Sequence, residues 1–476
     1  MPDRFSLTRA VPLCAALTVS MSLAASAQIP TNMRRLTPGV DRTVDSIATR
    51  VLAATGVPSA TVAVVQHGRL AYAQAYGNAK LDPSTPATPV MRYAIGSISK
   101  QFAATAILLL QQQGKLSLND PVGRYIPGLT EGNRVTIREI LSHTSGYQDF
   151  WPQDYVPPAM EKPITPQQIL NHWAKQPLDF APGTRWQYSN TNFTIAALIV
   201  EKASGQPFFQ FVRRHILAPL GIGSAVDFDA NGPGSVEPIG YMRCGLGPLR
   251  PATPTGSGWM YGAGELAMTA SDLAKWDISV IDHSLLKPAS YRTLEKTVLL
   301  SNGVSSGYGL GVDVGFTNGH RNISHTGEVA GFTAANMIFP DDSAAIVVLT
   351  NQDAGPASGA IAGQLANALF ATEDAQTQAR TARARGIFEG LQHGTIDRSL
   401  FTPDANAYFT AQALQDFESP LGPLGAITGF DQTSQQLRGG MLERLYRVTV
   451  GGRVLRVWTY ELPNGMLEQY QVAPMG

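Results

Sequence analysis

The stretch AIGSISKQF, residues 94–102, places Ser97 and Lys100 three residues apart at the start of an apolar run. On a helix that spacing puts both side chains on one face, with their Cβ atoms roughly 5–6 Å apart. A hydroxyl and an amine at that distance are a candidate nucleophile and base. The ordinary alternative is a serine that caps a helix and a lysine that points to solvent.

The residues that follow favour the chemical interpretation. Residues 102–110 are apolar nearly all round, which predicts a buried helix over 97–113 that ends at Gly114. A lysine in the first turn of such a helix is desolvated and lies at the positive end of the helix dipole. Both effects lower its pKa, by up to ~3–5 units for a fully buried amine. An amine near neutrality can accept the proton of Ser97.

Two further motifs carry groups that an acyl-transfer site requires. RWQYSNTNF, residues 185–193, offers the phenol of Tyr188 and the amide of Asn190. ISHTGEVAGF, residues 323–332, contains His325, Thr326 and Gly327, and the glycine allows backbone N–H groups to approach a substrate. Taken singly, the first motif is typical of a turn and the second of a strand end.

The pattern of apolar residues predicts an α+β fold. Two strands joined by a hairpin lie near the N-terminal end, and further strands return after a helix-rich middle. The expected strands are 60–66, 70–76, 308–316, 332–339 and 345–350, and the expected helices are 41–54, 97–113, 265–278 and 358–370. The simplest arrangement of these elements is one antiparallel sheet with strands from both ends of this region. Helices flank the sheet, and a helical subdomain is inserted into the chain.

The C-terminal part has a different character. We expect the main domain to span 40–372, a linker to span 373–382 and a small α+β accessory domain to span 383–476. Strands are expected at 441–450 and 453–461, joined at Gly451-Gly452, and at 466–472.

Composition limits the partners and the compartment. The chain has 36 acidic and 36 basic residues, which gives no reason to expect nucleic acid or an anionic membrane as partner. Residues 1–27 are typical of a signal peptide that ends in Ala25-Ser26-Ala27, which predicts a periplasmic or secreted protein without a stable membrane span after cleavage. Only Cys244 would then remain, and no metal-ligand spacing stands out, so we expect no metal and no cofactor.

In this order, the three motifs resemble the serine β-lactamase and penicillin-binding-like superfamily, in particular the class C β-lactamase-related hydrolases of the peptidase S12 kind. The supporting stretches are ILSHTSGYQDF (140–150), GAGELAMTASDLAKW (262–276) and YGLGV (308–312), and the resemblance covers about residues 42–370. It implies a β-lactamase/transpeptidase-like fold. The segment 383–476 loosely resembles NTF2-like domains.

The resemblance also implies roles for individual residues. Ser97 would be the nucleophile of an acyl-enzyme. Lys100 and Tyr188 would jointly act as base, with Tyr188 passing the proton to the leaving group. Asn190 would hydrogen-bond the substrate or Lys100.

The second half of the site would contribute substrate contacts. His325 stands where many members carry lysine, and Thr326 and Gly327 follow it. The N–H groups of Ser97 and Glu328 would form the oxyanion hole. Histidine, with a reference pKa of about 6.5, attracts a carboxylate less than lysine does. We therefore expect a small-molecule or peptide substrate with an ester or amide bond rather than efficient β-lactamase activity.

Several alternatives remain open at this point. Gly303-Val304-Ser305-Ser306-Gly307 matches the nucleophile elbow of α/β-hydrolases but lacks the following helix. His143 is a candidate base, although the resemblance makes its loop structural. Tyr147, Phe150 and Trp151 could line an acyl pocket, but packing is the preferred interpretation. The alternative function is a catalytically inactive protein that binds cell-wall peptides or has a structural role.

Overall fold

The computed structural model describes residues 33–34, 36, 40–370 and 375–475. Contacts between residues divide the chain into two units, Met1–Phe370 and Ala371–Gly476. The expected signal peptide, residues 1–27, lies outside the described residues.

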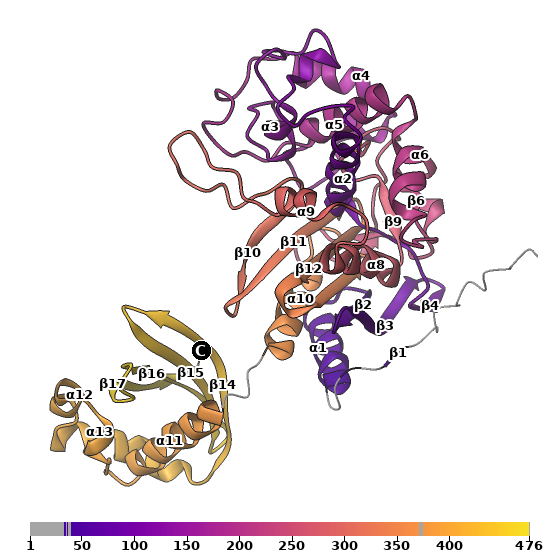
Figure 1. Ribbon diagram of the computed structural model, residues 1–476. Coiled ribbons are helices and arrows are strands. Elements are labelled where there is room, and N and C mark those ends of the chain that lie inside the picture. The colour runs from indigo at the N-terminus through magenta and orange to yellow at the C-terminus, as the bar shows by residue number, and fades with distance from the viewer. Residues whose placement is uncertain (1–32, 35, 37–39, 371–374, 476) are drawn as a thin grey trace, which may run out of the picture. The chain divides into compact units, whose positions relative to one another are not determined.

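The first unit is built on a large antiparallel sheet (Figure 1). Strands from the N-terminal part lie beside strands from residues 313–350, which confirms the expectation of a sheet assembled from both ends of this region. In spatial order the strands are β1 (Met33–Arg34), β3 (Arg69–Leu81), β2 (Ser59–Gln66), β13 (Ala344–Thr350), β12 (Phe332–Phe339), β11 (His320–Val329) and β10 (Asp313–Thr317), with β4 (Ser84–Pro86) paired to β3.

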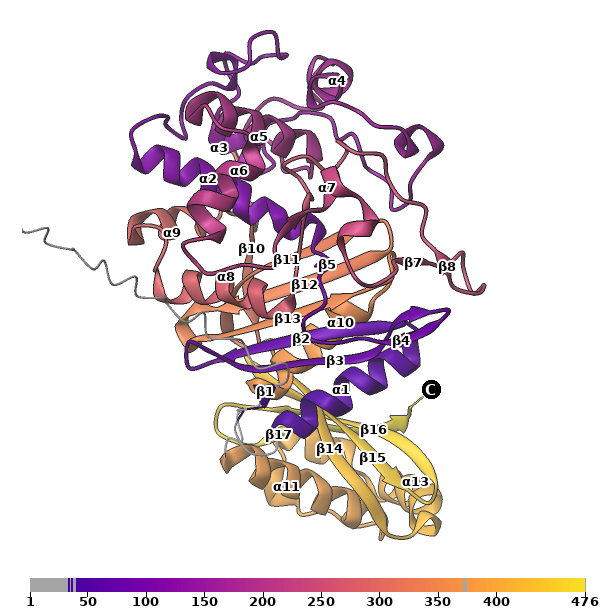
Figure 2. The ribbon, with the colours of Figure 1, turned by 90° about the vertical axis from the view of Figure 1, so that its right-hand side faces the viewer.

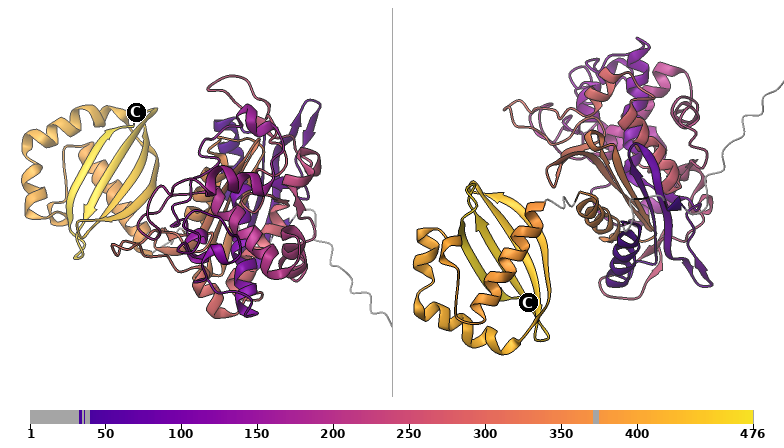
Figure 3. Two further views of the ribbon diagram at one scale, coloured as in Figure 1. Left: turned by 90° about the horizontal axis from the view of Figure 1, so that it is seen from above. Right: turned by 60° about the horizontal axis from the view of Figure 1, so that its bottom comes forward.

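Two helices cover one face of this sheet. They are α1 (Val40–Thr55) and α10 (Ala357–Leu369), which lie side by side in Figure 3. The buried residues of α1 recur every three or four positions, so one stripe of the helix faces the sheet. They are Val44, Ile47, Ala48, Val51 and Leu52. Together with the inward residues of β2 and β13 they form a separate apolar core.

The helical subdomain lies on the other face (Figure 2). Its central helix, α2 (Ser99–Gln112), is buried on nearly all sides, as its all-round apolar sequence predicts. The other helices are α3 (Ile137–Leu141), α4 (Pro166–Ile169), α5 (Asn190–Ser204), α6 (Phe208–Val212), α7 (Phe228–Asn231), α8 (Ala270–Asp282) and α9 (Pro288–Leu294). Short strands accompany them: β5 (Tyr93–Ala94), β6 (Val226–Asp227) and β9 (Leu266–Met268), and a pair of β7 (Tyr241–Met242) and β8 (Arg250–Pro251).

Two segments of the first unit differ from the expectation. The helix expected over 265–278 is α8, which begins only at Ala270, because Leu266–Met268 form β9 and the Thr269 side chain caps the helix. The strand expected over 308–316 is β10, which spans Asp313–Thr317, since Gly311 inside the expected run has a positive φ angle of 72°. Strand β11 was not among the expected strands, although the motif that contains His325 was interpreted as typical of a strand end.

The second unit is a small α+β fold. Its antiparallel sheet has the order β14 (Ile427–Arg438), β15 (Met441–Val450), β16 (Arg453–Glu461) and β17 (Leu467–Pro474), and its helices are α11 (Ala375–Leu391), α12 (Pro403–Tyr408) and α13 (Ala411–Leu421). The hairpin at Gly451-Gly452 is confirmed, with φ angles of 56° and 73° that suit a two-residue turn. Strand β14 was not expected, and the described part of the expected linker 373–382 is helical in α11.

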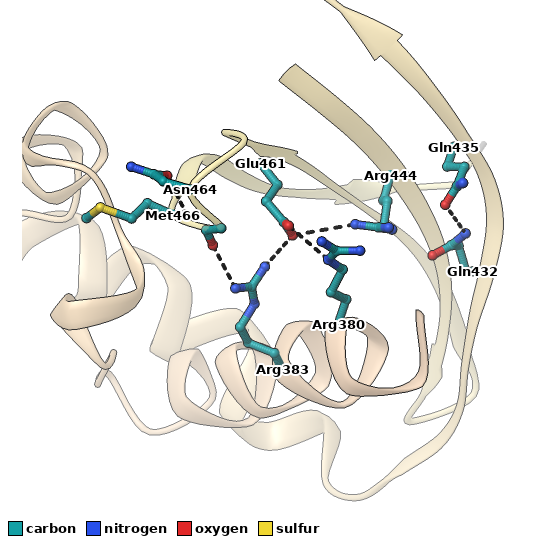
Figure 4. A network of polar contacts seen from close by, with 9 residues as sticks. Arg380, Arg383, Gln432, Gln435, Arg444, Glu461, Asn464 and Met466 are labelled. Atoms are coloured by element: carbon teal, nitrogen blue, oxygen red, sulfur yellow. Dashed lines mark hydrogen bonds and ion pairs between the residues drawn. The ribbon is translucent and has the colours of Figure 1, made fainter. Parts of the chain in front are cut away.

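An ionic network joins helix α11 to the sheet of the second unit (Figure 4). The Glu461 carboxylate accepts from Arg380 Nε at 2.8 Å and from Arg383 Nη2 at 2.5 Å, and Arg444 Nη1 lies 3.5 Å away. Glu461 and Arg444 are buried. One carboxylate therefore connects one helix and two neighbouring strands.

Candidate active site

Ser97 lies on a single 3₁₀ turn, Gly96–Ile98, immediately before α2. The N-cap residues of the turn and of α2 are Ile95 and Ile98, and neither makes a side-chain cap. The interpretation of Ser97 as a helix cap is therefore wrong. Its hydroxyl is half-buried and lines a cavity.

Lys100, the second residue of α2, is fully buried and has three hydrogen-bond partners. Its Nζ lies 2.9 Å from Ser97 Oγ, 2.8 Å from Asn190 Oδ1 and 2.8 Å from the carbonyl oxygen of Ala263. A neutral amine has two N–H bonds and one lone pair. Because Asn190 and Ala263 can only accept, they take the two N–H groups, and the lone pair is left for the proton of Ser97.

Burial lowers the pKa of Lys100 to about 7, against the opposing effect of the Asp149 carboxylate. Aromatic rings complete its surroundings: Nζ lies 4.8 Å from the ring centre of Tyr188 and 5.5 Å from that of Phe193. Near neutral pH a substantial fraction of the amine is thus uncharged and able to accept a proton.

Tyr188 and Asn190 stand at the beginning of α5, on either side of its N-cap Ser189. Burial raises the pKa of Tyr188, and the interaction of its hydroxyl with the Ser97 side chain opposes the rise. A phenol of this kind keeps its proton at neutral pH, but it is placed to pass a proton on from the serine. The structure therefore brings Ser97, Lys100, Tyr188 and Asn190 together.

Asp149 belongs to the site, although sequence reasoning did not single it out. Its Oδ1 accepts from the backbone N–H of Asn190 at 2.8 Å and from Asn190 Nδ2 at 3.1 Å. Since the amide nitrogen is held in this way, Asn190 Oδ1 must face Lys100. The only indication of Asp149 in the sequence is its position next to the last residue of ILSHTSGYQDF, residues 140–150.

Two glycines allow β11 to approach the Ser97 turn closely. A Cβ on Gly96, where φ is +51°, would lie 2.6 Å from Glu328 N, and a Cβ on Gly327 would lie 1.9 Å from the Ile95 carbonyl oxygen. Neither position has room for a side chain. The backbone of Gly327 and Glu328 is thereby held beside Ser97, the arrangement that an oxyanion hole from the Ser97 and Glu328 N–H groups requires.

His325 is buried and does not line the cavity. Its Nδ1 is 2.5 Å from the Thr326 carbonyl oxygen and therefore carries the proton, and its Nε2 accepts from the Tyr308 hydroxyl at 2.8 Å. Burial and the nearby Lys100 lower its pKa to about 3, so the ring is neutral.

Thr326 and Gly327 are also absent from the cavity lining, whereas Glu328 contributes to it. Tyr308, which sequence reasoning did not select, is the partner that fixes the His325 ring.

His143 packs against the ring of Tyr188, with ring centres 4.3 Å apart. Its Nδ1 accepts from the backbone N–H of Ser189 at 3.2 Å, and its pKa is lowered well below the usual value by burial and by Lys100. A neutral ring that supports Tyr188 and the start of α5 is a positioning residue rather than a base.

The cavity beside Ser97 has a volume of about 490 Å³. Phe150 and Trp151 line it, together with Tyr155 and Trp259 from other segments. Both interpretations hold for Phe150 and Trp151, which line the cavity and also pack in a small apolar cluster with Trp259. Tyr147 does not line the cavity: it is buried in the main core and donates to the Thr130 carbonyl.

Ser305 lies on an exposed loop between α9 and β10, and its Oγ accepts from the Gly307 N–H. The next element after Ser305 is strand β10 and not a helix, which removes the structural context of a nucleophile elbow. Within the described residues, no group of three or more His, Cys, Asp or Glu side chains is arranged to hold a metal ion. In the same part of the chain, no helix combines the length and apolar character needed to cross a bilayer.

Comparison with known proteins identifies the family. The family model described as Beta-lactamase matches residues 44–370, which is more than half of the chain. The chain belongs to the beta-lactamase family. This membership, with the geometry above, supports a serine hydrolase that works through an acyl-enzyme.

Several proteins resemble this beta-lactamase family member. Protein flp of Staphylococcus aureus (strain MW2) is 27% identical over 330 residues, which cover 67% of the chain and 64% of that protein. The structure of an octameric penicillin-binding protein homologue from Pyrococcus abyssi matches with a TM-score of 0.62 and 21% identity, over 91% of this chain and 99% of that chain. A D-stereospecific amidohydrolase from Streptomyces sp. matches with a TM-score of 0.58 and 25% identity, over 68% of this chain and 98% of that chain.

Proposed function

We propose that the chain is an exported serine hydrolase that cleaves an ester, amide or β-lactam-type bond through a covalent acyl-enzyme on Ser97. The observation that carries the proposal is the set of three hydrogen bonds at Lys100. In the neutral amine, Asn190 and Ala263 take the two N–H groups, which leaves the lone pair for the Ser97 hydroxyl. A protein that only bound peptides would not need a desolvated amine at this place.

The proposed reaction begins with transfer of the Ser97 proton to Lys100, jointly with Tyr188. Ser97 Oγ then attacks the carbonyl carbon, and the N–H groups of Ser97 and Glu328 stabilise the negative oxygen. Tyr188 delivers the proton to the leaving group as the carbonyl reforms. Water, activated by the same pair, attacks the acyl-enzyme and releases Ser97.

A relative and the state of His325 support a general substrate class. The name of the Streptomyces protein refers to amide hydrolysis with D-stereospecificity. A neutral, internally bonded His325 offers no cation to a substrate carboxylate. Both features favour an ester or amide substrate of small-molecule or peptide size over a β-lactam.

Covalent labelling tests this proposal. We expect a fluorophosphonate probe to modify the purified protein at Ser97, as located by peptide mass spectrometry. Ser97→Ala should abolish the label and hydrolysis, and the matched control Ser305→Ala should keep both. Unchanged hydrolysis in Ser97→Ala would refute the assignment, and an unlabelled but folded wild-type protein would favour the inactive peptide binder.

Export is a separate part of the proposal. It depends on the segment 1–27, and cell fractionation with N-terminal sequencing of the mature protein tests it. We expect the mature chain to begin after Ala27 and to occur in the periplasm or the medium. A cytoplasmic protein that retains residues 1–27 would contradict this expectation.

A further inference from the structure

The charged side chains that line the active-site cavity are all acidic. They are Asp149, Asp154, Glu328 and Asp353, and no Lys, Arg or His is among the described residues that line it. Asp149 is bound to Asn190 and serves the catalytic amine. Three carboxylates therefore remain to face a bound ligand.

These three carboxylates come from separate parts of the fold. Asp154 lies in the chain between α3 and α4, Glu328 lies near the end of β11, and Asp353 follows β13. Two of them accept from neutral backbone groups: Glu328 Oε1 accepts from the Ala354 N–H at 2.7 Å, and Asp353 Oδ2 accepts from the Gly331 N–H at 2.9 Å. Burial raises the pKa of Glu328, and the negative charges of Asp154 and Asp353 raise it further, so both carboxylates lie close enough to repel that of Glu328. Nothing that lines the cavity compensates this negative charge.

A second observation concerns the position where the family resemblance places a cation. His325 is neutral there, and both of its ring nitrogens are bound within the protein. Lys100 is buried and is not among the residues that line the cavity. A substrate carboxylate would thus meet negative side chains and no cationic side chain among the described residues that line the cavity, and like charges placed together are strongly unfavourable.

The walls of the cavity suit a cationic ligand in another way. Phe150, Trp151, Tyr155 and Trp259 line it with aromatic rings. The faces of such rings attract cations, most strongly Trp. Aromatic walls and carboxylates together are the usual surroundings of a bound ammonium group.

We propose that the substrates of this site carry an ammonium group near the scissile carbonyl, as aminoacyl esters and amides with a free amine do, and carry no carboxylate there. This inference rests on the proposed function and names its substrate class. Asp154, Glu328 and Asp353 bind the ammonium group, the aromatic rings pack against the acyl part, and Ser97 attacks the carbonyl carbon.

A charge series on one scaffold tests the inference. The substrates are phenylalanine p-nitroanilide with a free amine, its N-acetyl derivative and its N-succinyl derivative, in both enantiomers, assayed at pH 7. The free α-amino group has a pKa of about 7.7–8.0 and is mostly protonated there. We expect kcat/KM to be about tenfold or more higher for the free amine than for the acetyl compound, and lowest for the succinyl compound. The preference should shrink as ionic strength rises.

Variants show whether the carboxylates cause the preference. Asp154→Asn and Asp353→Asn should each reduce the amine-to-acetyl ratio of kcat/KM by about threefold to tenfold. The matched control is Asp82→Asn, because Asp82 is exposed in the turn between β3 and β4 and does not line the cavity. It should leave the ratio and the rates unchanged.

The outcomes distinguish this inference from the proposed function. Equal or faster hydrolysis of the acetyl or succinyl compound, with Ser97 still labelled by fluorophosphonate, would overturn the substrate class and leave the hydrolase proposal standing. An unchanged ratio in both Asp variants would also overturn the substrate class. Failure of the wild-type protein to react at Ser97 would instead overturn the proposed function.

Discussion

Lys100 illustrates how strongly the pKa of one side chain depends on its surroundings. An exposed lysine is an ammonium ion at neutral pH, whereas here burial brings the pKa to about 7. The residues that accept its hydrogens, Asn190 and Ala263, are about 90 and 160 positions away in the sequence. The chemistry of the Ser97 turn is therefore a product of the tertiary structure.

The pH dependence of hydrolysis should report this pKa. We expect kcat/KM for an uncharged ester to rise with pH through a midpoint near 7, because Lys100 must lose its proton before it can accept that of Ser97. A pH–rate profile measures the midpoint. A profile that does not change between about pH 5 and pH 9 would contradict Lys100 as base.

Asp149 should shift the same midpoint. Its negative charge raises the pKa of Lys100, so Asp149→Asn should move the midpoint to lower pH, by a few tenths to about one unit. The asparagine oxygen can still accept from Asn190, and kcat at high pH should fall less than in Asn190→Ala. Asp82→Asn is the control and should leave the midpoint unchanged. A shift to higher pH in Asp149→Asn would show that the two groups are not coupled as described.

At the scale of elements, the approach of β11 to the Ser97 turn is the contact that builds the site. It depends on Gly96 and Gly327, which face backbone atoms rather than flexible side chains. A larger residue at either position would separate the strand from the turn. The geometry of the Ser97 and Glu328 N–H groups would then be lost.

Gly327→Ala should therefore lower the activity more strongly than it lowers the stability of the fold. The Cβ would lie 1.9 Å from the Ile95 carbonyl oxygen, so the strand must move. We expect kcat to fall by about 10²-fold or more, as for loss of an oxyanion donor, together with a lower Tm. Kinetics and thermal unfolding measure the two effects.

Gly359→Ala is the matched control for that substitution. Gly359 lies in α10 with open space around its Cβ position, so alanine should stabilise the helix by about 0.5–1 kcal/mol and leave kcat unchanged. Normal activity in Gly327→Ala would contradict the role of the close approach.

The sequence predicted the parts of the fold that have a strong local pattern. The buried helix after Ser97 and the hairpin of β2 and β3 follow from apolar runs bounded by glycine, and both are present. Strand β11 has few apolar residues, and it is a strand because β10 and β12 pair with it on both sides. Asp149 was missed for a similar reason, since its role depends on a contact with Asn190 that no local spacing reveals.

At the scale of the whole molecule, the two units have separate cores. Every described residue that we place in the site lies between positions 97 and 353, inside the first unit. A protein that ends at Phe370 should therefore keep the kcat/KM of the full chain within about twofold, because the core of the second unit contributes no residue to the cavity. Steady-state kinetics on the truncated protein measure this, and a large loss would show that the second unit takes part in the reaction.

The stability of the second unit should depend strongly on a single carboxylate, that of Glu461. Glu461→Gln removes the negative charge that Arg380, Arg383 and Arg444 share (Figure 4). We expect a loss of about 2–4 kcal/mol in the free energy of unfolding of this unit. Chemical denaturation followed by circular dichroism measures the loss. Glu389→Gln, which removes an exposed pair with Arg385, is the control and should cost no more than about 0.5 kcal/mol. Equal effects of the two substitutions would contradict the importance of the network.

The three contacts of the Lys100 amine also have a consequence for the newly made chain. Before folding, the amine is hydrated and protonated, so the serine beside it is as inert as any other serine. Covalent inhibitors should then react only with native molecules. The labelled fraction in a denaturation series would count the intact first unit directly, without any need for a spectroscopic signal.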